Sequence, residues 1–394
     1  MKKLLLALLA VTGIGAAQAQ SSVTLYGILD VGYTGISERI STPVTGVQKS
    51  QTNKFGQSAE SSSRLGIKGQ EDLGGGTSAL FTAEFQLYPQ NQSLSSNQNF
   101  DTNGGLLNRQ TFVGIKQAGY GQVALGTQFT PVYNAVAATD PGALNNVVGS
   151  VINSANGSDG VSNDSFTTRS SNALTFTTDK FYGFSAGGMF AQNNQNSTQT
   201  QNTVGTSPNT YTYTTGGRNN QGGYGLNVDY TWNKLYAALA YQNFKTQQSY
   251  ATDYSTSWGQ AYGNTDSVNL KDAQTYAAAT YDFGILKAYA SWIGNKATST
   301  INSSQFAKRQ GQQLGVRAYI TPRVEGWASV GNGRVTAFGS GEPTANFTAY
   351  QLGANYYLSK RTNLYGIFGS TQTSSTSNGA AGANQYAMGV RHTF

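Results

Sequence analysis

The last eleven residues, 384–394, constrain the fold of this chain more than any other segment. One parity holds small or polar side chains, and the other holds large and mostly apolar ones: Tyr386, Met388, Val390, His392 and Phe394. Because successive side chains of a strand point to opposite faces, one face of this segment suits lipid and the other suits water. An amphipathic edge strand of a soluble sandwich has the same pattern. A final strand that ends on an aromatic carboxyl terminus is typical of an outer-membrane β-barrel.

The N-terminus has the form of a secretory signal peptide. Lys2 and Lys3 precede an apolar run over residues 4–16, and Ala17-Gln18-Ala19 is a small-x-small cleavage site. The apolar run is too short for a membrane-spanning helix. We therefore predict that residues 1–19 are removed on export and that residues 20–394 form one barrel domain, since no linker interrupts them.

The composition favours amphipathic strands, in which one side faces water. Charged residues make up 11% of the chain, against about a quarter in typical soluble domains, and there are 48 glycines and 24 tyrosines. The chain has no cysteine, so closure of a barrel rather than disulfides would hold it. Removing the two signal lysines from the net charge of +7 leaves +5, which either aids solubility or attracts anions. Nucleic-acid binding is not expected, because no dense basic run occurs.

Alternating segments recur along the whole chain. We predict sixteen antiparallel strands, at residues 22–34, 62–71, 77–88, 108–117, 121–129, 170–178, 183–191, 223–231, 235–245, 273–282, 285–294, 311–320, 324–332, 347–358, 362–370 and 384–394. Short turns and long polar segments alternate strictly between them. The fold class is therefore all-β: a sixteen-stranded transmembrane barrel with short periplasmic turns and long external loops.

The strand pattern assigns several charges to the water-filled interior. A basic residue on the lipid face costs about 2–4 kcal/mol at mid-bilayer, so the polar parity faces the lumen. This places Arg64 inward, and with it the other lumen charges Lys68, Glu84, Asp229, Lys287, Arg317 and Arg391. The faces of strand 108–117 are left open, because Arg109 shares its parity with Val113 and Ile115.

Several segments together resemble the Gram-negative general porin family of trimeric sixteen-stranded diffusion channels. The similarity runs over nearly the whole mature chain and rests on residues 22–30, 63–69, 71–76, 109–114, 126–131 and 389–394. It implies an outer-membrane homotrimer of a Gram-negative bacterium, in contact with outer-membrane lipid. We also expect the C-terminal strand, with Tyr386 and Phe394, to be the signal for the outer-membrane assembly machinery.

The resemblance also implies a charged constriction. In the family the third external loop folds into the barrel, and here the third long segment, residues 130–169, carries Asp140, Asp159 and Asp164. By motif match, Arg64, Arg109 and Arg169 are the basic candidates on the opposite wall, and Glu84 and Asp140 are the acidic ones. The same charges could instead simply solvate a wide lumen.

Competing functions are an enzyme, an adhesin or anchor, and a channel for one solute class. Catalysis is improbable because the single histidine, His392, is predicted on the outer face near the chain end, and no metal-ligand spacing or cofactor motif occurs. The polar loops are compatible with an adhesin. Tyr26, Tyr289 and Tyr319 on the lumen face are compatible with a selective channel. We favour a passive channel for small hydrophilic solutes and ions with a weak anion preference.

Overall fold

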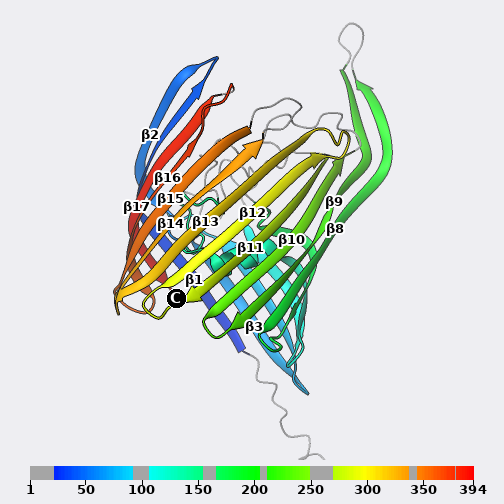
Figure 1. Cartoon of the computed structure of the whole chain (residues 1–394). Coiled ribbons are helices and arrows are strands. Elements are labelled where there is room, and N and C mark those ends of the chain that lie inside the picture. The colour runs from blue at the N-terminus through cyan, green and yellow to red at the C-terminus, as the bar shows by residue number, and fades with distance from the viewer. Residues whose placement is uncertain are drawn as a thin grey trace, which may run out of the picture.

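The protein is a closed antiparallel barrel (Figure 1). The computed structural model describes residues 22–91, 106–153, 166–204, 211–248, 269–336, 344–377 and 379–394. The predicted signal peptide, residues 1–19, lies outside the described residues, as do Asp159 and Asp164. The elements are β1 (Ser22–Thr42), β2 (Gly46–Gln57), β3 (Arg64–Gly74), β4 (Thr77–Gln86), β5 (Asn108–Gln117), β6 (Gly121–Phe129), α2 (Pro131–Thr139), β7 (Arg169–Thr178), β8 (Phe184–Val204), β9 (Tyr211–Trp232), β10 (Leu235–Gln248), β11 (Leu270–Asp282), β12 (Lys287–Ser299), β13 (Phe306–Thr321), β14 (Val324–Thr336), β15 (Thr344–Tyr357), β16 (Thr362–Thr373) and β17 (Ala380–Thr393).

Within the described residues, seventeen strand segments fill sixteen positions around the barrel, because β2 and β3 share one position. The upper half of β1 pairs with β2, from Val31↔Gln57 to Thr42↔Gly46. Its lower half pairs with β3, from Ser22↔Gln70 to Ile28↔Arg64. Residues 58–63 interrupt this position without changing its direction. The sequence prediction of a long connection over residues 35–61 is therefore wrong, because most of that interval is strand.

Each of the other predicted strands is present, and many are longer than predicted. The extensions lie mainly at the end of the barrel opposite the short turns. There β8 and β9 continue as a paired ribbon well past the point where alternation of apolar residues stops, and the ribbon projects from the rim (Figure 1). Backbone pairing continues there without an apolar face, so the hydrophobic pattern could not reveal it.

The barrel is apolar outside and polar inside. Exposed large side chains on the outer face recur on successive strands, among them Val113, Leu125, Leu226, Leu239, Leu314, Val330, Leu352 and Met388. Inward positions hold buried polar side chains such as Gln242, Gln274 and Gln351. Among the helices of the described segments, none is long and apolar enough to cross a membrane.

The C-terminal residue takes part in closing the barrel. β17 pairs with β1 from Ile28↔Thr393 to Ser41↔Ala380. Beyond the strand, Gly27 and Phe394 exchange two backbone hydrogen bonds, of 3.1 and 3.2 Å. A Cβ at Gly27 would come within 2.3 Å of the Phe394 ring, so this close approach requires glycine.

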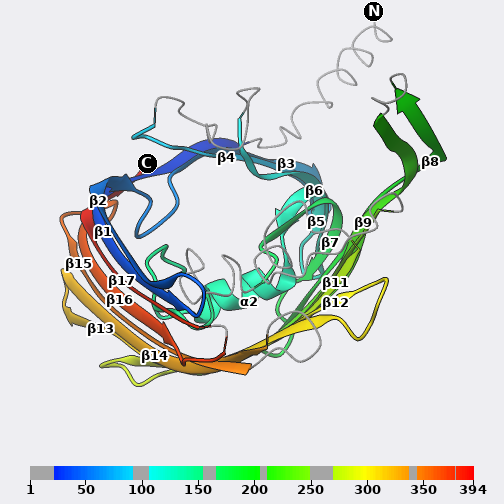
Figure 2. The ribbon, with the colours of Figure 1, turned by 90° about the horizontal axis from the view of Figure 1, so that it is seen from above.

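The third loop folds into the barrel, where α2 lies inside the ring of strands (Figure 2). Its buried side chains Val132, Val136 and Ile152 pack against Tyr276 and Ile293 of the inner wall. Val147 of the same loop belongs to a second cluster, with Trp327, Tyr365 and Ile367 of the wall. The hydrophobic core therefore lies between this loop and one side of the wall, rather than along the barrel axis.

A buried carboxylate holds the interruption between β2 and β3 in place. Asp30 is fully buried, and its Oδ2 accepts hydrogen bonds from the backbone N–H groups of Glu60 and Ser61, at 2.8 and 2.7 Å. Its Oδ1 accepts one from the Tyr365 hydroxyl at 2.6 Å. Residues 58–63 in turn reach the third loop, because Ala59 O and Ser58 O accept from Asn146. Asp30 thus links three separate parts of the lumen.

Replacing Asp30 by alanine should destabilise the barrel. The Asp30→Ala change leaves a buried hydroxyl and two partly buried N–H groups without an acceptor, which should lower the free energy of unfolding by about 4 kcal/mol. Tyr365→Phe removes one of these bonds and should cost about 1.5–3 kcal/mol. Urea unfolding in lipid vesicles measures both. The exposed Glu38, which accepts from Ser50 at 3.0 Å, provides the control. A Glu38→Ala cost equal to that of Asp30→Ala would contradict this account.

Candidate functional site

The third loop begins with a capped helix that docks on the inner wall. Thr130 is the N-cap of α2 and its hydroxyl accepts from Tyr133 N at 3.3 Å, while Pro131 occupies the first turn. Gln242 Oε1 of β10 accepts from Val132 N at 3.0 Å. At the far end of the helix, the Thr139 and Tyr276 hydroxyls lie 2.6 Å apart. Both ends of α2 are therefore bonded to the wall.

A row of inward-facing glutamines supplies hydrogen bonds to the loop backbone. Gln274 Oε1 accepts from Thr167 N at 2.9 Å, and Gln313 Oε1 accepts from Val151 N at 2.9 Å. Gln385 Oε1 accepts from Val148 N at 3.0 Å. Gln351 Nε2 donates to Val148 O at 3.0 Å, and its amide exchanges two bonds with the amide of Asn145. Together with Gln242, these side chains satisfy backbone groups that a buried loop would otherwise leave unpaired.

Sequence reasoning did not assign this role to the glutamines. Gln242, Gln274 and Gln351 are each the inward amide of an otherwise ordinary strand, and they come from β10, β11 and β15. Isolated glutamines at inward positions are a usable signal for a docked loop, but only once the partner segment is known to lie inside the barrel.

Strand β13 carries three docking residues spaced four apart on its inner face. Arg309 Nη2 donates to Val151 O at 2.7 Å, and its guanidinium lies 4.6 Å from the Phe347 ring centroid. Gln313 follows, and Arg317 donates to Pro141 O at 2.9 Å and to Glu325 Oε1 at 2.9 Å. Arg317 therefore anchors the loop to the inner wall. Arg309 lies just outside the predicted strand 311–320, which is why it was missed.

Asp140 differs from its predicted position facing the pore. Its carboxylate lies between the loop and β13, accepting from Leu144 N at 2.8 Å and from Gln313 Nε2 at 3.3 Å, and the residue is 8% exposed. Burial raises the pKa of this carboxyl, although its hydrogen bonds act in the opposite direction. The turn after α2, with Ala143 and Leu144 at positive φ, directs the side chain to the wall.

The wall also makes room for the loop at several glycines, and the approach is tightest at Gly369. A Cβ added at Gly369 of β16 would lie 1.7 Å from Val148 O. This approach brings the loop backbone within hydrogen-bonding distance of the Gln351 and Gln385 amides. Any larger residue at this position would push the loop toward the pore axis.

The wall that faces α2 carries the predicted basic residues on alternate strands. Arg109 Nε of β5 lies 2.8 Å from Glu84 Oε1 of β4, and Arg64 Nη1 of β3 lies 3.9 Å from the same oxygen. Tyr26 donates to Glu84 Oε2 at 3.1 Å. The side chains of Arg109 and Glu84 are 4% and 5% exposed, while that of Arg64 is 20% exposed. Arg109 is therefore largely neutralised by Glu84, and Arg64 remains accessible.

A β-bulge resolves the face of Arg109, which the sequence left open. Glu84 pairs with Gln110 and Phe85 pairs with Asn108, so Arg109 is an extra residue in β5. A bulge sets two residues opposite one on the neighbouring strand and can turn both to one face. The side chain of Arg109 consequently points inward beside Gln110, although Val113 and Ile115 remain on the outer face.

Arg169 begins β7, and its guanidinium lies over one aromatic ring rather than beside an acid. Its guanidinium carbon lies 5.2 Å from the Phe129 ring centroid. Phe129 in turn stacks on Tyr133 of α2 at a centroid distance of 4.1 Å. The Nε atoms of Arg64 and Arg169 have no hydrogen-bond partner in the part of the chain that the structure describes.

The remaining predicted charges lie on the inner face without forming a cluster. The Lys68 ammonium lies over the Tyr26 ring at 5.4 Å, and the Lys287 ammonium over the Tyr289 ring at 5.1 Å. Asp229 accepts from Asn227 and Tyr236, at 2.7 and 2.9 Å. Arg391 donates to Asn363 Oδ1 at 3.4 Å. His392 is exposed near the chain end, with Nδ1 2.8 Å from the Thr362 hydroxyl.

A barrel with an apolar exterior, a polar interior and a loop docked inside defines a channel-forming outer-membrane protein. The chain belongs to the Gram-negative porin family, whose model matches residues 5–376. It lies in the outer membrane. It is 28% identical, over the full length of both chains, to an outer membrane porin protein of Bordetella pertussis. It is 28% identical to outer membrane porin protein 32 of Delftia acidovorans, over 99% of this chain and 95% of that one.

The fold is similar to that of an anion-selective porin from Comamonas acidovorans. The TM-score is 0.66 at 22% identity, covering 95% of this chain and 100% of that one. At this level of identity the likeness concerns the fold alone.

Removing one docking glutamine should loosen the third loop. Gln313→Leu leaves Val151 N and the Ser150 hydroxyl without their partner, so the amide of Val151 should exchange hydrogen about 5- to 100-fold faster. Hydrogen exchange measured on the folded protein in detergent tests this. The neighbouring Gln312 faces outward and bonds to Asn332 at 2.8 Å. Gln312→Leu is the matched control and should leave exchange unchanged, and equal effects of the two variants would contradict the docking role.

Proposed function

We propose that this outer-membrane porin is a passive diffusion channel for small hydrophilic solutes and ions, with a weak preference for anions. The observation that carries the proposal is the charge of the wall opposite α2. Arg64, Arg109 and Arg169 contribute three positive charges there and Glu84 contributes one negative charge, which leaves a formal excess of +2. A narrow, partly desolvated passage with an excess of one sign raises the local concentration of counter-ions.

We assign the constriction to these four residues and the facing side of α2. Arg64 and Arg169 supply the unneutralised charge, because Arg109 is held by Glu84. Tyr133 in the first turn of α2 stacks on Phe129 at the end of β6, and the Arg169 guanidinium lies over the same Phe129 ring. Asp140 is left out, since its carboxylate is turned to β13. The excess of positive charge at the constriction is small, which favours a weak rather than a strict selectivity for anions.

The similarity to a porin described as anion-selective agrees with this direction. The net charge of the mature chain, +5 after the two predicted signal lysines are removed from +7, has the same sign. Neither observation alone fixes the selectivity, because ions respond to the charges nearest their path rather than to the whole molecule.

Neutralising the accessible arginines should shift selectivity toward cations. Arg64→Gln and Arg169→Gln should each lower the anion-to-cation permeability ratio by about twofold to fivefold, the effect of removing one charge at several ångströms in a largely aqueous passage. Glu84→Gln should raise the ratio by a similar factor. Reversal potentials in a KCl gradient across a planar bilayer measure all three variants.

The control for these variants removes a charge away from the pore. Arg323 lies in the turn between β13 and β14 at the rim of the barrel. Arg323→Gln should change the ratio by less than either lumen variant. Cation preference of the unmodified protein would overturn the anion proposal, and unchanged ratios for Arg64→Gln and Arg169→Gln would remove them from the constriction.

We further propose that the channel is a homotrimer and that Tyr386 and Phe394 mark the C-terminal strand for the assembly machinery. Family resemblance supports the trimer, as does Phe55, which is 79% exposed on the outer face and packs edge-on to Tyr33 at 5.6 Å. Tyr386 and Phe394 both face outward, and they are 37% and 39% exposed.

Conductance of unheated protein should then appear in groups of three equal steps. Light scattering with detergent correction should give three chains per particle, and heating should convert this to one. A single chain per particle before heating would contradict the trimer. Phe394→Ser should reduce the amount of folded protein reaching the outer membrane in cells more than Tyr120→Ser, a change at an exposed aromatic residue in a short turn.

A further inference from the structure

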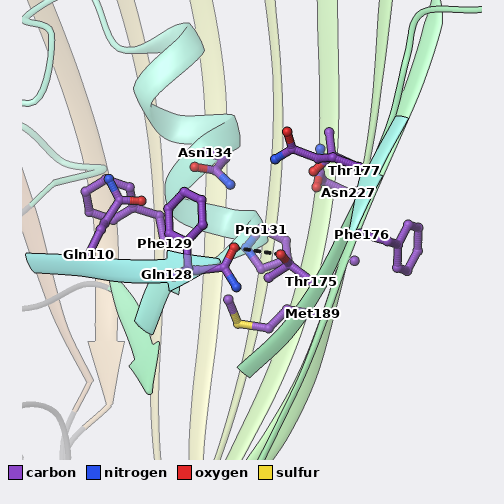
Figure 3. A pocket seen from close by; sticks show the side chains of 14 residues that line it. Gln110, Gln128, Phe129, Pro131, Asn134, Thr175, Phe176, Thr177, Met189 and Asn227 are labelled. Atoms are coloured by element: carbon purple, nitrogen blue, oxygen red, sulfur yellow. Dashed lines mark hydrogen bonds between the residues drawn. The ribbon is translucent and has the colours of Figure 1, made fainter. Parts of the chain in front are cut away.

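A separate hollow in the inner wall lies beside the first turn of α2 (Figure 3). Its volume is about 140 Å³. Strands β5 to β9 form its back and sides, and Pro131 and Asn134 of α2 form its near edge. Gly187 of β8 also lines it, and a Cβ there would come within 2.4 Å of Asn227 Oδ1. We call this hollow the α2 niche.

Four polar side chains in the α2 niche have no hydrogen-bond partner within the described segments: Gln110, Gln122, Asn134 and Thr177. They come from β5, β6, α2 and β7, so four separate elements direct free amide or hydroxyl groups to one small volume. Figure 3 shows Asn134 and Thr177 on facing sides. By contrast, Gln128 is engaged by Thr175 at 2.7 Å and by Ala124 O at 3.2 Å.

The rest of the lining is apolar or already bonded, and none of the lining residues is charged. Phe129, Phe112 and Pro131 offer flat apolar surfaces beside the free amides. The combination of amides, which both donate and accept, with ring faces suits a molecule that has hydroxyl groups on its edges and C–H groups on its faces. It gives an anion no charged partner within the niche itself.

We propose that the α2 niche is a weak binding site for small uncharged polyols, of glycerol to pentose size. A cavity of about 150 Å³ holds a six-membered ring of carbon atoms in another protein, so about 140 Å³ accommodates a polyol of this size, and the open side tolerates a few more atoms. Each hydroxyl of such a solute can both donate to and accept from the free groups of the niche. This assignment goes beyond the anion preference and does not depend on it.

With the α2 niche, the lumen would contain separate regions for charged and for uncharged solutes. Anions are concentrated by Arg64 and Arg169, while neutral polyols are held beside α2 by groups that carry no charge. A site inside a channel must release its solute readily, so the binding is weak. Its signature is flux that saturates with concentration, whereas diffusion through an unoccupied pore increases linearly.

The test is the flux of labelled arabinose into vesicles that contain the full-length mature protein. In the unmodified protein, flux should saturate and unlabelled arabinose should compete. Asn134→Ala and Gln122→Ala each remove one free amide, and alanine is compatible with both a helix and a small inner-face position. Each variant should raise the half-saturating concentration about threefold to tenfold, the loss expected for one hydrogen bond. Single-channel conductance in KCl should stay near its original value.

A matched pair of variants, each removing one hydroxyl group, distinguishes binding in the niche from binding elsewhere in the lumen. Thr177 lies in the niche, whereas Thr24 lies on the inner face of β1 opposite Lys68. Thr177→Val should raise the half-saturating concentration, and Thr24→Val should not. Linear flux in the unmodified protein, or equal half-saturation in all variants, would overturn the proposal. Stronger competition by acetate than by arabinose would assign the niche to anions and would also overturn it. Reversal potentials of the same preparations report separately on the anion preference.

Discussion

Every backbone N–H and C=O group of a chain inside a membrane must find a partner within the protein, and the structure depends on this constraint. Pairing of β17 with β1 satisfies the last strand edge and closes the wall. The third loop meets the same demand inside the lumen, where its irregular backbone cannot pair with a neighbouring strand. Side-chain amides of the wall take the place of that pairing, from Gln242 on β10 to Gln385 on β17.

Docking of the loop divides the interior into two unlike sides. Strands β10, β11, β13, β15 and β17 each direct inward polar groups to the loop, so Arg317 and Gln313 act mainly as anchors. Strands β3 to β7 remain uncovered, and their inward groups meet water and solutes. Arg64 and Arg169 belong to this uncovered side, and the α2 niche lies where β5 to β7 meet β8, β9 and the first turn of α2. The loop therefore decides which charges of the wall can act on a permeating solute.

Much of the barrel could be predicted from the chain. The strands at 108–117 and 121–129 match β5 and β6 residue for residue. The errors have physical causes. Residues 35–61 carry too little apolar alternation to be recognised as strand, yet β2 pairs with β1 along its whole length. The family resemblance predicts Asp140 at the pore, whereas its carboxylate bonds to Leu144 N and Gln313 Nε2, contacts that depend on the path of the loop.

The sequence by itself determined the closed barrel, its orientation of faces and its porin family, because alternation of side chains with period two is a local property that lipid and water enforce at each strand. Only the tertiary structure decided which inward residues meet the pore. Arg109 faces inward because of a bulge against β4, and Asp140 faces the wall because of its contacts with Gln313 and Leu144. The α2 niche joins residues from five strands and one helix. These outcomes depend on contacts between segments far apart in the chain, which no local pattern encodes.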